Sequence, residues 1–388
     1  MSKLLLVLGI VLFISLVVVH EFGHFIVAKR NGVEPEEFGI FFPPKLWGHK
    51  TKSGWLFSIN LLPLGGFVKL KGEYDAAKGK GTYGAAKLGV KAKILLAGVG
   101  MNLLAAFVLL TLLGWLGMPQ LISNQFNIKS DTHVIKNEVL VGEIENPSPA
   151  EKIGLKSGDR LLAITNPSGK KVNITSSNQL IDITKNYAGE TVTVEYSRSG
   201  NVHEAQTTFR SKNVVEASLK TNNPKGYLGV VPEANYSLTR STWSAPINAL
   251  GLMVQFTALT FHGIGVAIHG LGSIIAAAVT GNHAAREAGQ TQASNQVAGP
   301  VGVVKILNNG SILGYQFVLM VIAVISLSLA LINVLPIPPL DGGKLFMTVV
   351  ARLRHKKLTE RVEALASGIG FAFFFLLIIL ITIADVRR

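Results

Sequence analysis

The first apolar stretch of the chain, residues 4–28, reads LLLVLGIVLFISLVVVHEFGHFIVA. A helix of roughly 20 residues crosses the hydrocarbon core of a bilayer, so this stretch is long enough to span one. The apolar core of a cleaved signal peptide is shorter and leads into small residues at a cleavage site. This stretch instead contains two histidines and a glutamate near its end, which favours a retained membrane-spanning helix.

The composition of the whole chain agrees with a membrane protein. Hydrophobic residues make up 48% of its 388 residues and charged residues only 15%, whereas a soluble protein has roughly 25% charged residues. These proportions exclude a disordered chain, a collagen-like repeat and a coiled coil. Because there are no cysteines, disulfides, thiolate metal sites and cysteine nucleophiles are excluded, and any metal is held by His, Asp, Glu or backbone oxygen.

The apolar stretches predict a multi-span α-helical membrane protein with four transmembrane helices, a membrane-associated β-hairpin on the cytoplasmic side and an inserted soluble α+β domain. The expected parts are, in chain order, a first transmembrane helix (1–30), a cytoplasmic β-hairpin with a basic loop (31–93), a second transmembrane helix (94–119), a soluble domain (120–232), an interfacial amphipathic helix with a loop (233–311), a third transmembrane helix (312–343), and a basic cytoplasmic loop with a fourth transmembrane helix (344–388).

The basic residues indicate which segments lie in the cytoplasm. The net charge is +14, but the excess lies in segments that flank apolar stretches, so we expect a lipid bilayer and no nucleic acid as a partner. Residues 29–93 carry 12 Lys/Arg against 5 acidic residues, and residues 341–367 carry 6 against 3. Cytoplasmic loops are enriched in Lys and Arg, so we expect both segments in the cytoplasm, and both termini and the soluble domain outside. Residues 76–93 could lie as a flexible arm on anionic lipid.

The stretch from Trp243 to Val279 has two interpretations. It is apolar enough for a fifth span, but its glycines and periodic polar residues favour a helix at the membrane interface. It contains His262 and His269, which we interpret as interfacial or packed residues rather than a second metal site, because they lack carboxylate neighbours. The following residues, 282–296, are polar and predict a loop.

The motif His20-Glu21-Phe22-Gly23-His24 indicates a metal site. Residues i and i+4 of a helix share a face, so both imidazoles can reach one ion. Zn²⁺ accepts histidine nitrogens in tetrahedral geometry, and a catalytic zinc keeps one position for a water whose pKa it lowers. Glu21 can take the proton of that water without binding the metal. The alternative is a polar helix end that reaches toward water, but His20 lies inside the apolar run, where ionisable residues are costly and usually functional.

Asp341 is a candidate for a third ligand, since two histidines are not sufficient to hold a catalytic zinc. It follows the proline-rich segment Asn333–Leu340 at the expected cytoplasmic end of the third span. Prolines break a helix, and irregular backbone at membrane depth occurs only where it faces protein or water. The alternative is that Asp341 caps the helix that follows.

The two motifs together resemble the site-2 protease family of intramembrane zinc metalloproteases (M50 type), and the chain is similar to bacterial regulator-of-sigma-E proteases. The resemblance implies that His20, His24 and Asp341 bind Zn²⁺ and that Glu21 is the catalytic base. It also implies that Asn333 lies beside the active site and handles substrate.

Residues 38–71 resemble the membrane-associated β-hairpin of the same family. Within them, residues 55–60 and 67–71 are β-prone and are separated by a proline and two glycines. An exposed strand could pair with the backbone of a substrate as it unwinds. The alternative is that the hairpin only fills the cavity. The residues that we expect to handle substrate here are Phe57, Ser58, Ile59 and Asn60.

The soluble region resembles a PDZ domain. Residues 149–166 are similar to the bacterial signature A-x-x-A-G-L-x-x-G-D-x-I-x-x-I-N, in which we expect Gly158 to adopt positive φ and Asp159 to bond local backbone. PDZ grooves bind peptide strands, and the resemblance implies a filter that excludes intact substrates by size. The length of residues 120–232 fits one PDZ-like domain, whereas the similar protease has two. A second departure is residues 97–102, which lack the family's proline but keep Asn102, a residue able to bond across helices.

The resemblance implies a zinc-dependent intramembrane endopeptidase of the bacterial inner membrane, with its active site toward the cytoplasm and its PDZ-like domain outside. The implied substrates are single-span membrane proteins, such as anti-sigma factors, or signal-peptide remnants, first shortened by an upstream site-1-type protease. One alternative is a non-proteolytic membrane scaffold that binds peptides through the PDZ-like domain. A metal transporter is a second alternative, but the spans contain few polar residues for an ion path.

Overall fold

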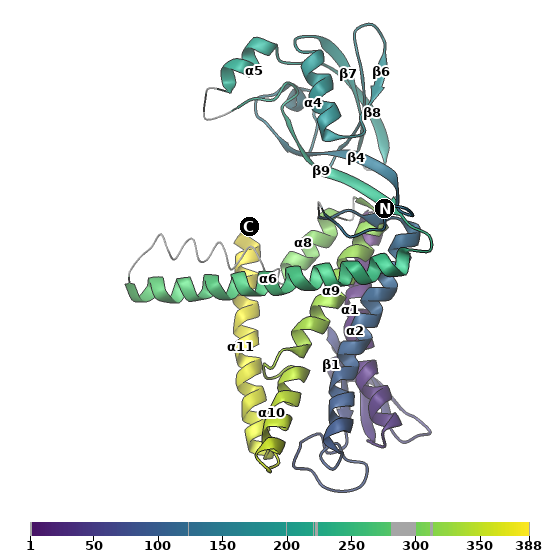
Figure 1. Ribbon diagram of the computed structural model, residues 1–388, viewed down its shortest axis with the longest axis vertical. Helices are drawn as coiled ribbons and strands as arrows, with labels where there is room; N and C mark the ends of the chain where they lie inside the picture. The colour runs from purple at the N-terminus through teal and green to yellow at the C-terminus, as the bar shows by residue number, and fades with distance from the viewer. Residues whose placement is uncertain are drawn as a thin grey trace. The chain divides into compact units, whose positions relative to one another are not determined.

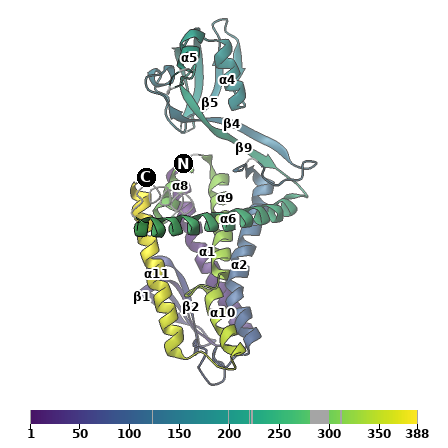
Figure 2. The same ribbon diagram turned by 60° about the vertical axis from the view of Figure 1, so that its left-hand side comes forward.

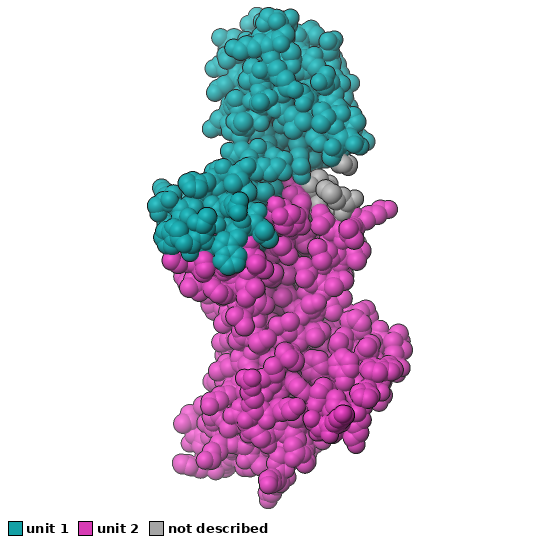
Figure 3. Space-filling model, turned by 90° about the vertical axis from the view of Figure 1, so that its right-hand side faces the viewer, with its two compact units in different colours: residues 1, 113–245 teal, residues 2–112, 246–388 magenta. Residues whose placement is uncertain are grey.

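The computed structural model describes residues 2–122, 124–198, 200–219, 221, 224–280, 300–310 and 313–387. The predicted loop at 282–296 lies outside these residues. The chain forms two compact units, which Figure 3 colours separately. Residues 113–245 form one, here called the sheet unit, and residues 2–112 with the chain from Pro246 onward form the other, here called the helical unit.

The helical unit is built from long apolar helices. Their bounds are α1 (Ser2–Arg30), α2 (Leu88–Leu116), α6 (Ala245–Thr280), α8 (Pro300–Gly310), α9 (Tyr315–Val334), α10 (Asp341–Leu353) and α11 (Glu360–Arg387). In the described part of the chain, 5 helices are long and apolar enough to cross a membrane, namely α1, α2, α6, α9 and α11. Figures 1 and 2 show α6 running across α9 and α11, which is the direction expected of an interfacial helix. The number of spans, four, stays a prediction.

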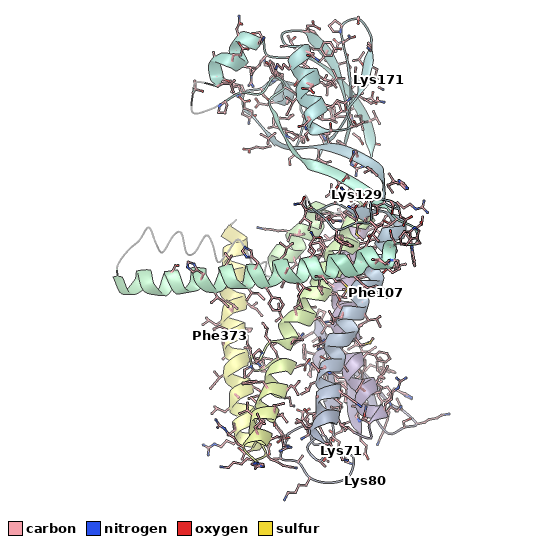
Figure 4. All side chains as sticks on the ribbon, viewed as in Figure 1. Lys71, Lys80, Phe107, Lys129, Lys171 and Phe373 are labelled. Carbon is pink, nitrogen blue, oxygen red and sulfur yellow. The ribbon has the colours of Figure 1, made fainter. Side chains whose placement is uncertain are left out.

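Large apolar side chains cover the outside of these helices. Leu4 on α1 is 73% exposed, Val254 on α6 is 72% exposed and Phe371 on α11 is 65% exposed. Such surfaces are favourable in lipid and unfavourable in water. In Figure 4 the labelled lysines 71 and 80 lie at one end of the unit, and the labelled phenylalanines 107 and 373 lie along the helices. The protein is therefore a multi-pass membrane protein.

The helical unit also contains a sheet formed by β1 (Pro35–Lys50) and β2 (Leu56–Leu70). Each strand bends back on itself, so Gly39 lies opposite both Phe67 and Ser58, and Ser58 also lies opposite Gly48. The order across the sheet is therefore 45–50, 56–60, 35–40, 66–70. The two β-prone segments of the predicted hairpin are strands, but they do not pair with each other, because residues 35–40 lie between them.

The sheet unit is an antiparallel sheet with short helices. Its strands are β3 (Met118–Pro119), β4 (His133–Ile144), β5 (Arg160–Thr165), β6 (Lys171–Asn173), β7 (Thr191–Arg198), β8 (Asn201–Thr208) and β9 (Val230–Arg240), and its helices are α3 (Pro149–Lys152), α4 (Ser177–Asn186) and α5 (Lys212–Ser218). The strand order is β3-β9-β4-β5-β7-β8, with β6 paired to β5. The core lies between the strands and α4, where Val141, Ile164, Val194 and Leu180 are buried.

The turn before β5 has the predicted geometry. Gly158 has a φ of 86°, a conformation that glycine adopts without steric cost. Asp159 Oδ2 accepts a hydrogen bond of 2.8 Å from the backbone N–H of Lys156. Both expectations for this motif are confirmed.

Candidate active site

Helix α1 places both histidines of the motif on one buried face. His20 is 7% exposed and His24 is 6% exposed. Their Nε2 atoms lie 3.1 Å apart, because a spacing of four residues returns a side chain to the same face one turn later. Both rings therefore present the same nitrogen to a common point.

Asp341 reaches that point from the start of α10, although it is 321 residues from His20 in sequence. Its Oδ2 lies 3.0 Å from His20 Nε2 and 3.2 Å from His24 Nε2. The prolines between α9 and α10 end α9 and let the chain turn, and Asp341 then begins the new helix. The alternative, that Asp341 caps this helix, does not fit its position, because the cap residue is Leu340 and Asp341 is the first residue inside the helix.

The three atoms form a nearly equilateral triangle that fits a zinc ion. Their separations are 3.0, 3.1 and 3.2 Å. Tetrahedral zinc with bonds of about 2.0–2.1 Å places its ligand atoms about 3.3 Å apart, so the separations agree within a few tenths of an ångström. Two imidazole nitrogens and one carboxylate oxygen are also ligands that zinc accepts, and three protein ligands leave a fourth position open.

Close packing of α1 on α2 depends on glycine at two positions. A Cβ on Gly98 of α2 would lie 2.5 Å from His24 Nε2 and 2.6 Å from His20 Cε1. A Cβ on Gly23 of α1 would lie 2.6 Å from the carbonyl oxygen of Ala97. The imidazole rings occupy the space that any larger residue at position 98 would need. Gly98 was not among the site residues predicted from the sequence.

Helix α2 also supplies partners for the second nitrogen of each ring. His24 Nδ1 lies 2.7 Å from the carbonyl oxygen of Ile94. The Nδ1–H of His24 donates a hydrogen bond to this oxygen. His20 Nδ1 lies 3.3 Å from the carboxamide of Asn102. Such contacts orient a metal-binding imidazole and select the nitrogen that faces the metal. A backbone carbonyl leaves no trace in a sequence, so Ile94 could not have been found there.

Glu21 lies on the same turn of α1. One oxygen of its carboxylate lies within 4.8 Å of a ring nitrogen of His20 and of a ring nitrogen of His24. Its Oε2 accepts a hydrogen bond of 3.1 Å from the backbone N–H of Val68. The outer edge of residues 66–70 in β2 therefore faces Glu21. This edge is a candidate for binding a peptide backbone, although the residues expected to handle substrate were 57–60 of the other β-prone segment.

The residues expected to handle substrate have different surroundings. Ser58 and Asn60 are 0% and 1% exposed, and the strand that carries them is paired on both sides. The amide of Asn60 donates to the carbonyl oxygens of Ile40 and Phe41. Neighbouring strands use both edges of this strand, so it offers no free edge to a substrate backbone. A role of Phe57, Ser58, Ile59 and Asn60 in handling substrate stays a prediction.

Asn333 lies near the end of α9. Its Nδ2 donates a hydrogen bond of 2.9 Å to the carbonyl oxygen of Leu329 one turn earlier. This contact stays within its own helix, so the role of Asn333 in handling substrate stays a prediction.

Two buried histidines lie four residues apart on α1, with one carboxylate beside them and a second carboxylate from a distant helix. This cluster offers the types of ligand that a catalytic zinc uses. The sequence pattern of peptidase family M50 matches residues 8–377, and the chain belongs to this family. It is a zinc metalloendopeptidase and an intramembrane protease of the site-2 protease type.

The relatives match the chain over its whole length. A protein of Clostridium acetobutylicum is 28% identical over 100% of this chain and 98% of its own length. The zinc metalloprotease RasP of Shouchella clausii is 25% identical over 98% of each chain. RasP of Geobacillus kaustophilus is 24% identical over 98% of this chain and 97% of its own. Among solved structures, the PDZ domain of an SdrC-like protein from Listeria innocua is similar over 25% of this chain and 93% of its own, with 23% identity and a TM-score of 0.19.

Proposed function

We propose that this protein cleaves the transmembrane segments of single-span membrane proteins, in regulated intramembrane proteolysis or in the removal of signal-peptide remnants. The observation that carries the proposal is the convergence of His20, His24 and Asp341, with separations of 3.0–3.2 Å, between helices whose outer surfaces are apolar. A site at this position reaches peptide bonds that lie within the membrane. Anti-sigma factors are one class of single-span substrate that fits.

In this proposal His20, His24 and Asp341 hold the zinc, and Glu21 handles the proton. Zinc, when bound, polarises the scissile carbonyl and makes a water molecule more acidic. Glu21 lies close enough to take a proton from the attacking water and to return it to the leaving amine. The hydrogen bond from the Val68 N–H holds the carboxylate of Glu21 in place.

The edge of residues 66–70 is proposed to hold the substrate backbone. The N–H of Val68 points away from β1 and toward Glu21, and because N–H directions alternate along a strand, those of Gly66 and Leu70 point the same way. Peptide bonds in a helix have their carbonyls hydrogen-bonded and shielded, so an unwound segment held against this edge is a better substrate. Asn333, near the end of α9, is proposed to help handle the substrate.

The remaining parts of the proposal follow from charge and resemblance. The basic segments 29–93 and 344–361 support an active site toward the cytoplasm of a bacterial inner membrane, with the sheet unit outside. In that position a PDZ-like domain would exclude intact substrates, so an upstream site-1-type protease would first trim them.

Replacement of Glu21 by glutamine tests the proposal. E21Q removes the proton acceptor and keeps the three proposed ligands, so zinc content should be unchanged while cleavage of a reporter transmembrane peptide is lost. The control is E216Q, which changes an exposed glutamate of α5 that is 57% exposed. Cleavage by E21Q at a rate close to that of E216Q would contradict the assignment of Glu21.

A further inference from the structure

The two proposed histidine ligands have unequal partners at their second nitrogen. A neutral imidazole carries one proton, and when Nε2 binds a cation that proton lies on Nδ1 and needs an acceptor. For His24 the acceptor is the carbonyl oxygen of Ile94 at 2.7 Å. For His20 the group at Nδ1 is the carboxamide of Asn102, at 3.3 Å.

Asn102 is held firmly beside His20. It is 1% exposed, and it lies on α2 one turn after Gly98, the residue that lets the two rings approach this helix. Its carbonyl oxygen accepts a hydrogen bond of 2.8 Å from Ser326 Oγ on α9. The backbone of Asn102 is thereby tied to a second helix.

The carboxamide of Asn102 contains a buried oxygen without a partner. Its Nδ2 faces His20 Nδ1, whereas Oδ1 has no hydrogen-bond partner among the described residues. A proton on His20 Nδ1 would face the amide N–H in this orientation, but the two ends of a carboxamide exchange places by a half-turn. After that half-turn Oδ1 faces His20 Nδ1 at hydrogen-bond distance.

We propose that Asn102 is a positioning residue: its Oδ1 accepts a hydrogen bond from the Nδ1–H of His20, and this keeps Nε2 of His20 directed at the zinc with its lone pair free. This inference rests on the zinc site proposed above. Asn102 would thus orient a zinc-binding imidazole from α2, a helix that supplies none of the proposed zinc ligands. The amide is neutral, so it fixes the tautomer of His20 without adding a charge inside the membrane.

The experiment measures zinc affinity rather than activity. Full-length protein in detergent is titrated with zinc against a competing chelator, as wild type and as N102L, N102D, T111V and H20A. N102L removes the acceptor and keeps a similar volume, so its dissociation constant for zinc should rise about 10- to 100-fold, as is typical when an outer hydrogen-bond partner is lost. N102D keeps an acceptor and should remain close to wild type.

Thr111→Val is the matched control. Thr111 lies on the same helix, is 6% exposed and has an oxygen with no hydrogen-bond partner among the described residues, so T111V removes a buried polar atom away from the site and should bind zinc as wild type does. The visible spectrum of the Co²⁺-loaded protein should change in N102L and not in T111V. If N102L does not accumulate, N102A removes the same acceptor without added bulk.

The outcomes separate this inference from the zinc site itself. Zinc affinity in N102L equal to that of T111V would overturn the role of Asn102, and so would an N102D affinity as weak as that of N102L, since the loss would then come from packing. If H20A retains wild-type zinc affinity, the proposed zinc site is wrong. If H20A loses zinc and N102L does not, the zinc site stands and the role of Asn102 fails.

Discussion

At the scale of single residues, the site requires empty space as well as ligands. The rings of His20 and His24 lie against the backbone of α2 at Gly98, where a methyl group would overlap both rings. The ligand atoms are already close to tetrahedral separations, so a small displacement of either ring separates them from Asp341. A glycine here is therefore required by the proposed metal site, although it binds nothing.

Gly98→Ala should weaken zinc binding. Overpacking of this kind costs about 1–3 kcal/mol, which corresponds to about a 5- to 150-fold loss of zinc affinity if the protein relaxes by moving the rings. The control is G100A on the same helix, where an added Cβ meets nothing within 4 Å. Chelator competition on both variants provides the measurement, and equal affinities in G98A and G100A would contradict this account of the packing.

At the scale of elements, a buried ion cluster joins the loop before α2 to α10 and α11. Asp75 is 0% exposed and forms ion pairs with Lys91 of α2 and Arg352 of α10. It also accepts a hydrogen bond from the N–H of Leu358, and its own N–H donates to Glu363 of α11. Because α10 begins with Asp341, this cluster fixes the helix that supplies the third proposed ligand.

Asp75→Asn should destabilise the helical unit. Lys91 is 0% exposed, and removal of one partner from a buried ion pair leaves an uncompensated charge that costs about 3–5 kcal/mol. Thermal unfolding in detergent should therefore occur at a lower temperature in D75N. The control is D182N, which removes an exposed aspartate of α4. Equal unfolding temperatures of D75N and D182N would show that the cluster does not stabilise the fold.

The same cluster predicts a dependence of stability on acid pH. Burial alone would raise the pKa of Asp75, but its hydrogen bonds from Lys91 and Leu358 and the charge of Arg352 outweigh this, and the pKa is lower than that of a free aspartate. A carboxylate with a lowered pKa contributes stability above its unfolded pKa of about 3.9, and the contribution is lost as the pH falls below that value. As the pH falls below about 4, the wild-type protein should therefore lose more stability than D75N. Unfolding temperatures of both proteins in a series of pH values provide the measurement.

At the scale of the whole molecule, zinc should stabilise one unit and not the other. The three proposed ligands all lie in the helical unit, whereas the core of the sheet unit is formed by its own strands and α4. A ligand that binds only the folded state stabilises the part that holds it. Removal of zinc by a chelator should therefore abolish cleavage and speed hydrogen exchange in α1, α2 and α10.

Exchange in the strands of the sheet unit should not change when zinc is removed. Hydrogen–deuterium exchange with mass spectrometry on the full-length protein provides both measurements in one sample, and zinc added back serves as the control. A loss of protection confined to the sheet unit would place the metal elsewhere.

Composition and local spacing of residues were sufficient to predict the membrane class and the proposed chemistry. Apolar runs longer than a bilayer core, and a histidine pair with a fixed helical spacing, depend only on residues close together in the chain, so periodicity and composition reveal them. The turn at Gly158 and Asp159 was predictable for the same reason.

Which distant residues come into contact depends on how the helices and strands pack in three dimensions. The position of residues 35–40 between two parts of β2, the approach of Gly98 to both imidazoles, and the carboxamide of Asn102 at His20 depend on packing between elements. Every residue has a backbone carbonyl and can lie at a strand edge, so no sequence pattern marks a strand's free edge or the carbonyl of Ile94 as part of a site. Hydrophobic patterning is a local property, whereas pairing partners and close approaches are set by the global minimum of packing and hydrogen bonding, which no single segment encodes.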